Sequence, residues 1–406
     1  MSRLPRQQIL QCYAAALAAV RGEACVRQFL NAHPLSDQPV TLLAMGKAAT
    51  SMAKGACAVL TPQLANGLVV TRTGYVDADL PGVLTVREAG HPLPDKDSLA
   101  AGQAVIALVQ TLPPENQLLV LTSGGTSALV EALPDGIGLA DLVRLNQWLL
   151  GSGLPIQAIN RVRQSVSRIK GGGLARLLRG QPALNLLISD VPGDDPAVIG
   201  AGLFYPALAE VREVELPDWV HALQRRARSV PRECGPVMAH HIIANNRIAC
   251  EAACATAQQA GLAATVHDRP LAGAVEHVAQ WLVNDLAHQA PGIHIWGGET
   301  TVRLPARSGR GGRNQQLALL VALQLAGRED IQLLAAGTDG SDGSSGDAGA
   351  MVDSATVLRG EEVGLDAAIC LARADAGSFL EASGDLVHTG PTGTNVMDIV
   401  IACKAG

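Results

Sequence analysis

Aromatic side chains are scarce in this chain of 406 residues, because Phe, Tyr and Trp make up 2% of it while 48% of its residues are hydrophobic. Its cores must therefore be packed mainly by Ala, Leu and Val. No apolar stretch reaches membrane-spanning length, and the start of the chain, MSRLPRQQIL, lacks a signal-peptide core. The net charge is −6 and no long basic run occurs, which argues against nucleic acid or an anionic membrane as a partner. We expect a cytoplasmic protein.

The eight cysteines form neither a disulfide framework nor a recognised zinc-ligand spacing. Most lie in runs rich in Ala, Val and Leu, where a reduced cysteine behaves as a small hydrophobic residue. Cys250 and Cys254 stand one helical turn apart, downstream of His240 and His241, so a zinc site is the alternative there. We interpret the cysteines as core residues.

The chain is longer than one hydrophobic core usually allows, so we expect two domains, at residues 1–235 and 236–406, with the active site in the cleft between them. Apolar segments of strand length alternate with helical patterns, which is typical of α/β domains with largely parallel sheets. We expect a Rossmann-like N-terminal domain and a smaller C-terminal one. The predicted strands cover residues 40–45, 67–72, 83–88, 117–122, 184–188, 237–245, 266–269, 292–296, 331–336 and 395–402. The main predicted helices cover residues 6–30, 48–60, 99–112, 247–260, 274–287 and 314–325.

The segment 337–353, GTDGSDGSSGDAGAMVD, follows the predicted strand 331–336 and contains four aspartates among glycines and serines. Glycine lets a backbone approach a ligand closely, and clustered carboxylates repel one another unless a cation lies among them. A solvated loop or linker is the alternative. Because open α/β folds bind ligands at the carboxyl ends of strands, we predict that this segment, with Gly337 and Asp339, lines a site for phosphate, hydroxyls and magnesium.

Lys47 lies where the predicted strand 40–45 meets the helix 48–60. A P-loop would need glycine at position 41, which is Thr41, so that motif is excluded. A lysine at a helix start adds to the positive end of the helix dipole, which favours anion binding. A solvated surface lysine is the alternative.

The segment 123–127, SGGTS, follows the strand 117–122 and precedes a predicted helix near residue 128. Free backbone N–H groups, hydroxyls and two adjacent glycines predict a cradle for phosphate or carboxylate, with Ser123, Gly124 and Gly125 as its binding residues. An ordinary Ser or Thr helix cap is the alternative.

Further charged residues and glycines are candidates for the same phosphate and magnesium site. The basic stretch 160–173 contains Arg163 and Lys170, which we expect to face the cleft. Asp190 follows the strand 184–188, and Gly298 and Glu299 follow the strand 292–296. Arg310 and Arg313 lie in a glycine-rich helix start and predict another anion site. His91 either reaches a substrate or is a turn residue.

These motifs occur in the order found in a known family, and together they span about residues 6–402. The chain resembles the type II glycerate 2-kinases, which carry a leucine-rich C-terminal MOFRL domain and of which some members are labelled hydroxypyruvate reductases. The resemblance rests on residues 45–48 (MGKA), 90–95 (GHPLPD), 123–125 (SGG), 169–172 (IKGG), 189–194 (SDVPGD), 297–301 (GGETT), 309–314 (GRGGRN) and 337–353. One departure is Gln164-Ser165, where the family pattern has a Lys-His pair.

The resemblance implies transfer of the γ-phosphoryl group of ATP to the 2-hydroxyl of D-glycerate, with Mg²⁺. Phosphoryl transfer needs cations on the phosphates, a metal, alignment and a base for the hydroxyl. We assign Lys47 and Arg313 as the cations, Asp190 and Glu299 as candidates for base or metal ligand, and Asp190 and Asp339 as candidate metal ligands. The expected partners are D-glycerate and ATP, with a homodimer as one oligomeric state to test. Because neither Lys47 nor Arg313 lies in an apolar run, replacing either should leave the melting temperature near that of the wild type.

Two other functions stay open. An NAD(P)-dependent hydroxypyruvate reductase would need a G-x-G-x-x-G turn after its first strand, and the likeliest strand is followed by Gly46-Lys47-Ala48-Ala49, without a second glycine. A non-catalytic sensor of phosphorylated sugar acids would use the segment 123–127. Such a sensor leaves Asp190, Glu299 and Asp339 unexplained.

Overall fold

The computed structural model describes residues 6–76, 79–154, 156–206, 214–227, 235, 238–343 and 345–406. The chain divides into two compact units, which we call the first unit (Arg21–Ala244) and the second unit (Met1–Val20 with Asn245–Gly406). The boundary predicted between residues 235 and 236 adjoins positions outside the described residues. The observed change of unit comes later, because residues 239–244 form a strand of the first unit's sheet.

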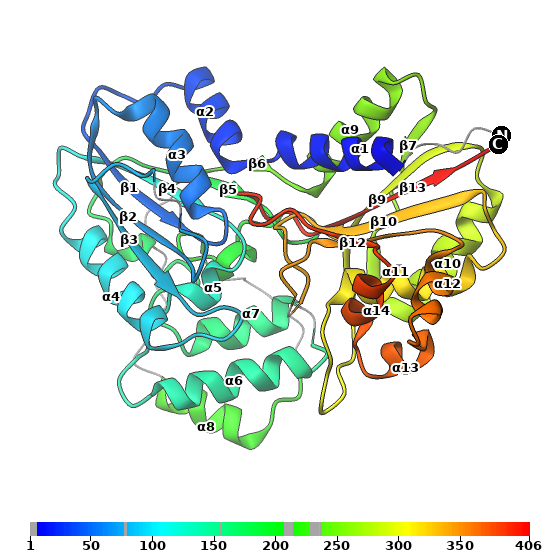
Figure 1. Cartoon of the computed structure of the whole chain (residues 1–406). Helices are drawn as coiled ribbons and strands as arrows, with labels where there is room; N and C mark the ends of the chain where they lie inside the picture. The colour runs from blue at the N-terminus through cyan, green and yellow to red at the C-terminus, as the bar shows by residue number, and fades with distance from the viewer. Residues whose placement is uncertain are drawn as a thin grey trace. The chain divides into compact units, whose positions relative to one another are not determined.

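The first unit is built on a six-stranded sheet in the order β3-β2-β1-β4-β5-β6 (Figure 1). Every neighbouring pair is parallel, which confirms the Rossmann-like α/β domain. All carboxyl ends therefore meet at one edge of the sheet. The strands are β1 (Val40–Met45), β2 (Leu64–Arg72), β3 (Leu84–Ala89), β4 (Gln117–Thr122), β5 (Ala183–Ile188) and β6 (Ala239–Ala244).

Small residues allow close helix packing in the first unit, as the scarcity of aromatics predicts. Every residue of β1 and β4 is buried, which suits central parallel strands covered on both faces. A Cβ atom on Gly55 of α3 would lie 2.4 Å from the carbonyl oxygen of Glu23 in α2, so only glycine fits there. The helices are α2 (Gly22–Ala32), α3 (Ala49–Leu60), α4 (Lys96–Gln110), α5 (Thr126–Leu129), α6 (Leu139–Gly151), α7 (Ile156–Ser165) and α8 (Asp218–Arg226), with 3-10 turns η1 (Ala175–Leu177) and η2 (Ile199–Ala201).

The second unit contains a mixed sheet in the order β12-β11-β10-β13-β9-β7, with β8 also paired to β9. The prediction of a largely parallel sheet is wrong here, because β10 pairs antiparallel with both β11 and β13, and β13 pairs antiparallel with β9. A loop without a crossover helix joins β10 to β11, so the chain reverses direction between them. The strands are β7 (Ala264–Val266), β8 (Leu271–Ala274), β9 (Gly292–Thr301), β10 (Ile331–Gly337), β11 (Gly349–Val352), β12 (Leu386–Val387) and β13 (Asp398–Lys404).

The core of the second unit lies between this sheet and the helices α10 and α11, with Trp296 and Phe379 among its largest buried side chains. The single helix predicted over residues 6–30 is two helices, since Arg21 adopts extended backbone angles between them. The first of these, α1, packs on α9 in the second unit. The helices are α1 (Arg6–Ala19), α9 (Asn246–Gln259), α10 (Val275–His288), α11 (Arg313–Gln324), α12 (Thr356–Glu362), α13 (Ala367–Ala372) and α14 (Ala376–Ala382).

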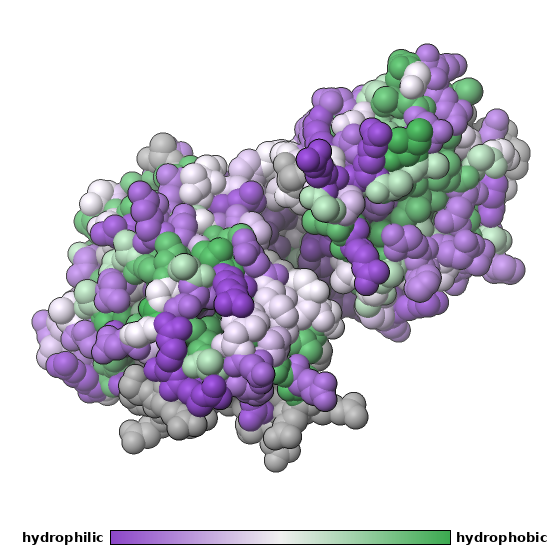
Figure 2. All heavy atoms as spheres, turned by 90° about the horizontal axis from the view of Figure 1, so that it is seen from below, coloured by the Kyte–Doolittle hydropathy of each residue, from purple (hydrophilic) through white to green (hydrophobic). Residues whose placement is uncertain are grey.

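Polar side chains cover much of the face shown in Figure 2, with apolar side chains between them. Exposed large apolar residues include Leu358, Val363 and Ile369 in or beside α12 and α13. Within the described residues, no single helix is long and apolar enough to cross a membrane; α1 and α2 taken together pass on length and composition only.

Candidate active site

In the first unit, the turns that follow β1 and β4 are bound to each other. Gly46 has φ +119°, and a Cβ atom there would lie 2.2 Å from Oγ of Ser123, so the turn requires glycine. The backbone N–H of Ala48 donates to Oγ of Ser123 (3.1 Å), and that of Lys47 donates to the carbonyl oxygen of Gly124 (2.9 Å). The predicted anion cradle and Lys47 therefore form one rigid assembly at the carboxyl edge of the sheet.

Gly125 lies against the side chains of both His91 and Lys47. It has φ +85°, and a Cβ atom there would lie 3.1 Å from Cδ2 of His91 and 3.2 Å from Cγ of Lys47. Gly125 is also the N-cap of α5, and no side chain caps that helix. The alternative of a Ser or Thr cap is thus not what the structure shows. The hydroxyl of Thr126 donates instead to the carbonyl oxygen of Ser123 (2.7 Å).

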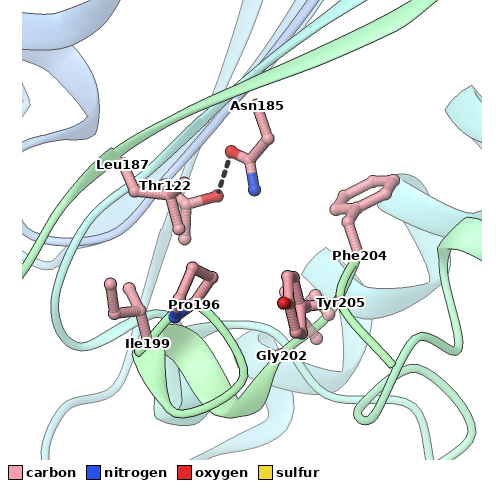
Figure 3. A pocket seen from close by; sticks show the side chains of 9 residues that line it. Thr122, Asn185, Leu187, Pro196, Ile199, Gly202, Phe204 and Tyr205 are labelled. Carbon is pink, nitrogen blue, oxygen red and sulfur yellow. Dashed lines mark hydrogen bonds between the residues drawn. The ribbon is translucent and has the colours of Figure 1, made fainter. Parts of the chain in front are cut away.

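A buried polar chain supports the end of β4 from behind. Thr122 donates from Oγ1 to Oδ1 of Asn185 (3.0 Å), and Nδ2 of Asn185 lies 3.3 Å from Nδ1 of His240. Figure 3 shows Thr122 and Asn185 facing each other in a small pocket whose other walls include Phe204 and Tyr205. Burial, and then His241, lower the pKa of His240, which keeps its Nδ1 able to accept. Thr122 directly precedes the cradle, so this chain of hydrogen bonds fixes the cradle's position.

In the basic stretch 160–173, Lys170 does not have the exposure expected for a residue that lines a cleft. Lys170 is 3% exposed and forms a buried ion pair with Glu131, whose other oxygen accepts from Ser167 (2.5 Å). Burial lowers the pKa of Lys170, and Glu131 opposes that shift. Lys170, which we expected to face the cleft, is therefore buried inside the first unit. Arg163 is half-buried, donates to Oδ1 of Asn146 (3.0 Å), and has its pKa lowered by burial.

The departure at Gln164-Ser165 has a structural role. Gln164 donates to the carbonyl oxygen of Ala201 (3.2 Å), and Ser165 accepts from Gln224 of α8 (3.0 Å). These hydrogen bonds hold α7 against its neighbours.

Asp190 lies half-buried just after β5. Because β5 pairs with β4, Asp190 is at the same sheet edge as the cradle.

In the second unit, Arg313 is the first residue of α11 and lies among carboxylates. It pairs with Glu299, and its Nη2 lies 3.4 Å from Oδ2 of Asp398. Its side chain is 40% exposed, yet its Nε is buried and has no hydrogen-bond partner among the described residues. Glu299 lies on β9, which continues to Thr301, rather than in a loop after residue 296 as predicted.

The described residues of the segment 337–353 are largely buried, which contradicts the alternative of a solvated linker. Asp339 is 6% exposed and Asp342 is 2% exposed. Asp342 accepts the N–H groups of Asn314 (3.1 Å) and Gln315 (2.8 Å), and so caps α11. The end of the segment forms β11.

Gly337 is the point where two of these carboxylates approach each other. A Cβ atom on Gly337 would lie 3.3 Å from Oδ1 of Asp398 and 3.5 Å from Oδ1 of Asp339. The hydroxyl of Tyr13 donates to the carbonyl oxygen of Gly337 (2.6 Å). Burial raises the pKa of Tyr13, and Asp339, Asp398 and Asp342 raise it further, which shows how close this hydroxyl lies to them.

The second unit thus concentrates negative charge at this place. Burial, followed by the charge of Asp398, raises the pKa of Asp342 to about 7. Burial raises the pKa of Asp398 to about 6, although Arg313 opposes the shift. For Arg313, burial acts to lower the pKa, but Asp398, Glu299 and the two loop aspartates outweigh burial and raise it. One guanidinium does not balance these carboxylates, so a bound cation would stabilise them.

Within the described residues, no group of three or more His, Cys, Asp or Glu side chains converges well enough to hold a metal by itself. Nothing there supports the zinc alternative, and Cys250 is a buried core residue. Mg²⁺ commonly binds through only one or two carboxylates together with substrate phosphates. The oxygens of Asp339 and Asp398 beside Gly337 fit that smaller requirement, whereas Asp190 belongs to the other unit.

Several residues of this site were not predicted from the sequence. Asp398 interrupts the apolar run NVMDIVIA, and a carboxylate in a buried strand is a signal that could have identified it. Tyr13 lies in a helix more than three hundred residues away in sequence, and no local pattern indicates its role. The Thr122–Asn185 pair also lacks a sequence signal, since both residues fit ordinary strands.

Comparisons with known proteins match most of the chain. A family model described as a domain of unknown function, DUF4147, matches residues 8–225, and the MOFRL family model matches residues 292–398. A D-glycerate 2-kinase of Thermotoga maritima is 34% identical, covering 89% of this chain and 90% of its own. A relative from Agrobacterium vitis, provisionally named a hydroxypyruvate reductase, is also 34% identical, over 97% and 93% of the two chains. The crystal structure of a glycerate kinase from T. maritima matches with a TM-score of 0.83 at 32% identity, covering 98% of this chain and 99% of that one.

Proposed function

We propose a kinase activity for this chain, which belongs to the family of proteins that combine the DUF4147 and MOFRL domains. The reaction is phosphorylation of the 2-hydroxyl of D-glycerate by ATP, giving 2-phosphoglycerate. The observation that carries the proposal is the rigid cradle of Ser123, Gly124 and Gly125 with Lys47 beside it. The N–H of Ser123 already donates to the carbonyl oxygen of Met45, so the cradle offers a phosphate the N–H groups of Gly124 and Gly125 and the cation of Lys47. Relatives of this length named glycerate 2-kinase supply the substrate and the choice of hydroxyl.

In this proposal the phosphate-binding residues belong to the first unit. Lys47 and the cradle bind the phosphates and the transferring phosphoryl group. Asp190, at the same edge of the sheet, serves as a metal ligand. Arg313 binds the carboxylate of glycerate, because a guanidinium matches carboxylate geometry. Glu299 pairs with Arg313 and therefore orients it. Mg²⁺, held by Asp339 or Asp190 with the phosphates, would neutralise charge that develops as the phosphoryl group moves.

The first prediction is the reaction itself. The purified protein with Mg·ATP and D-glycerate should release ADP and form 2-phosphoglycerate, identified by NMR. Formation of 3-phosphoglycerate would disprove the choice of hydroxyl and leave the kinase class intact. This assay is the most informative one, because it distinguishes phosphorylation of the 2-hydroxyl from phosphorylation of the 3-hydroxyl. The residues of the site favour a kinase, but the choice of hydroxyl rests on the relatives.

The reductase is the second candidate, favoured by the names of relatives such as that from A. vitis. Its test is absorbance at 340 nm with NADH and hydroxypyruvate, where we expect no oxidation of NADH. The turn at Gly46 supports this expectation, since it packs against Ser123 and lacks the second glycine of a dinucleotide site. A thermal-shift measurement distinguishes a sensor from a kinase. The melting temperature of a sensor should respond to a phosphorylated sugar acid but not to Mg·ATP, whereas that of a kinase should also respond to Mg·ATP.

The second prediction concerns the metal. Asp339→Asn should raise the magnesium concentration that gives half-maximal rate, because it removes one of two carboxylates beside Gly337. Asp190→Asn tests the other candidate ligand in the same titration. Asp268→Asn is the matched control, since its carboxylate is 93% exposed and pairs with Arg247. If neither Asp339→Asn nor Asp190→Asn changes the magnesium dependence, both residues are removed as ligands.

The cytoplasmic location and the homodimer stay predictions from the sequence. Size-exclusion chromatography with light scattering tests the homodimer directly.

A further inference from the structure

An exposed histidine in the second unit is held by a buried carboxylate. Nδ1 of His388 lies 2.5 Å from Oδ1 of Asp347. The side chain of His388 is 67% exposed, whereas that of Asp347 is 6% exposed. A ring nitrogen so close to a carboxylate must carry the proton, so the neutral imidazole has its lone pair on Nε2.

Asp347 is itself fixed from its other side. Its Oδ2 accepts from Nη2 of Arg310 (2.9 Å) and from Oγ of Ser345 (2.5 Å). Arg310 also pairs with Glu381. Desolvation acts to raise the pKa of Asp347, but these hydrogen bonds and the nearby charges outweigh it and lower the pKa, so Asp347 stays ionised. The charged groups around the imidazole are thus Asp347, with Arg310 and Glu381 behind it.

The aspartate-rich segment 337–353 contacts residues near both His388 and Arg313. A Cβ atom on Gly340 would lie 1.9 Å from the carbonyl oxygen of Gly390, which is two residues after His388. Three residues further along this segment, a Cβ atom on Gly343 would lie 2.4 Å from the carbonyl oxygen of Gly311, two residues before Arg313. The loop therefore contacts both the Arg313 turn and the His388 turn.

We propose that His388, oriented by Asp347, is the base that accepts the proton of the glycerate hydroxyl. The assignment rests on the proposed kinase function. It rests on geometry, because a buried carboxylate that holds Nδ1 of an exposed imidazole is the arrangement of general bases in nucleophile activation. Glu299, a base candidate from the sequence, is engaged by Arg313 instead.

Nε2 of His388 takes the hydroxyl proton as the glycerate oxygen bonds to the γ-phosphorus. The bond from that phosphorus to the β,γ-bridging oxygen breaks, and ADP leaves with the electron pair. The imidazolium, stabilised by Asp347, then releases the proton to solvent. No oxidant or further reactant is needed.

Chemical rescue is the test. His388→Ala should lose about 10²–10⁴-fold in kcat with D-glycerate and Mg·ATP, the usual contribution of a general base. Because the side chain is exposed, the melting temperature should stay near that of the wild type. Added imidazole should restore part of the rate in His388→Ala, since it supplies the missing base, and a merely structural residue would not respond to it. His277→Ala, which removes an exposed histidine on α10, should keep the full rate.

Asp347→Asn tests the orienting role through a double-substitution cycle. If Asp347 acts through His388, adding Asp347→Asn to His388→Ala should cost little more than His388→Ala alone. A folded His388→Ala that keeps more than a third of the wild-type kcat, or that imidazole does not rescue, would overturn the proposal for His388 and leave the kinase standing. A wild type that forms no phosphoglycerate would overturn both.

Discussion

Lys47→Ala should lose nearly all kinase activity and keep the wild-type fold. The side chain lies half-buried at the start of the helix region after β1, beside Gly125 and His91. The backbone N–H of Lys47 is already used by Gly124, and that contact survives substitution by alanine. A cation at this place stabilises the transferring phosphoryl group more than the bound substrate, so kcat should fall more than KM rises. Losing such a cation costs on the order of 10²–10⁵ in rate.

Lys54→Ala is the matched control for Lys47→Ala. Lys54 lies on α3, the helix that follows Lys47, and its ammonium group pairs with the exposed Asp79. We expect a wild-type rate for this variant, measured in the same coupled assay of ADP release. The alternative of a solvated lysine applies to Lys47 if Lys47→Ala retains more than about a tenth of the wild-type kcat, a loss too small for a transition-state cation. Unchanged melting temperatures in both variants would show that the comparison concerns catalysis.

The sequence was most informative in the parallel sheet. Strands β1 and β4 have the predicted bounds, because a strand buried on both faces reads as a continuous apolar run that ends where the turn glycines begin. Parallel strands also place the turns after them at one edge. The proximity of Lys47 to the cradle therefore follows from the topology alone, once the strands are known.

The second unit was less predictable because its site depends on contacts that are distant in sequence. Tyr13, Arg313 and Asp398 come from three separate segments, and the antiparallel pairing of β10 with β13 brings Asp398 next to Gly337. Apolar strands alternating with helices suggest parallel pairing by default, and they do not reveal a direct loop from β10 to β11. A local pattern cannot specify such pairing.

The sequence does not show which charged residues are buried, and this is where the predictions for charged residues failed. Lys170 was expected to face the cleft because it lies in the basic stretch 160–173. Its partner Glu131 lies in a different segment, and only the fold shows that the two charges compensate each other in the core. The same reason makes the expectation of an unaffected melting temperature doubtful for Arg313, whose neighbours are likewise distant in sequence.

Arg313→Ala should therefore differ from Lys47→Ala, by losing activity and stability together. Arg313 pairs with Glu299 and lies 3.4 Å from the buried Asp398, so its removal leaves that carboxylate without its nearest described counter-charge. Charged hydrogen bonds contribute about 1.5–3 kcal/mol, and because Arg313 is 40% exposed we expect a value in the lower half of that range, about 2 kcal/mol. For a unit of this size, that lowers the melting temperature by roughly 4–8 °C. The activity loss should reach on the order of 10²–10⁵ in kcat.

The instability of Arg313→Ala should also depend on pH, with a sign that the structure fixes. The pKa of Asp398 is raised to about 6, so the folded protein holds that proton more tightly than the unfolded chain does. The ionised form is thus the costly one in the folded state, and Arg313 offsets its cost. The difference in melting temperature between wild type and Arg313→Ala should be small at pH 5 and larger at pH 8. Arg247→Ala, which removes an exposed ion-paired arginine on α9, should show almost no difference at either pH. A difference that is equal at pH 5 and pH 8 would mean that Arg313 does not act on Asp398.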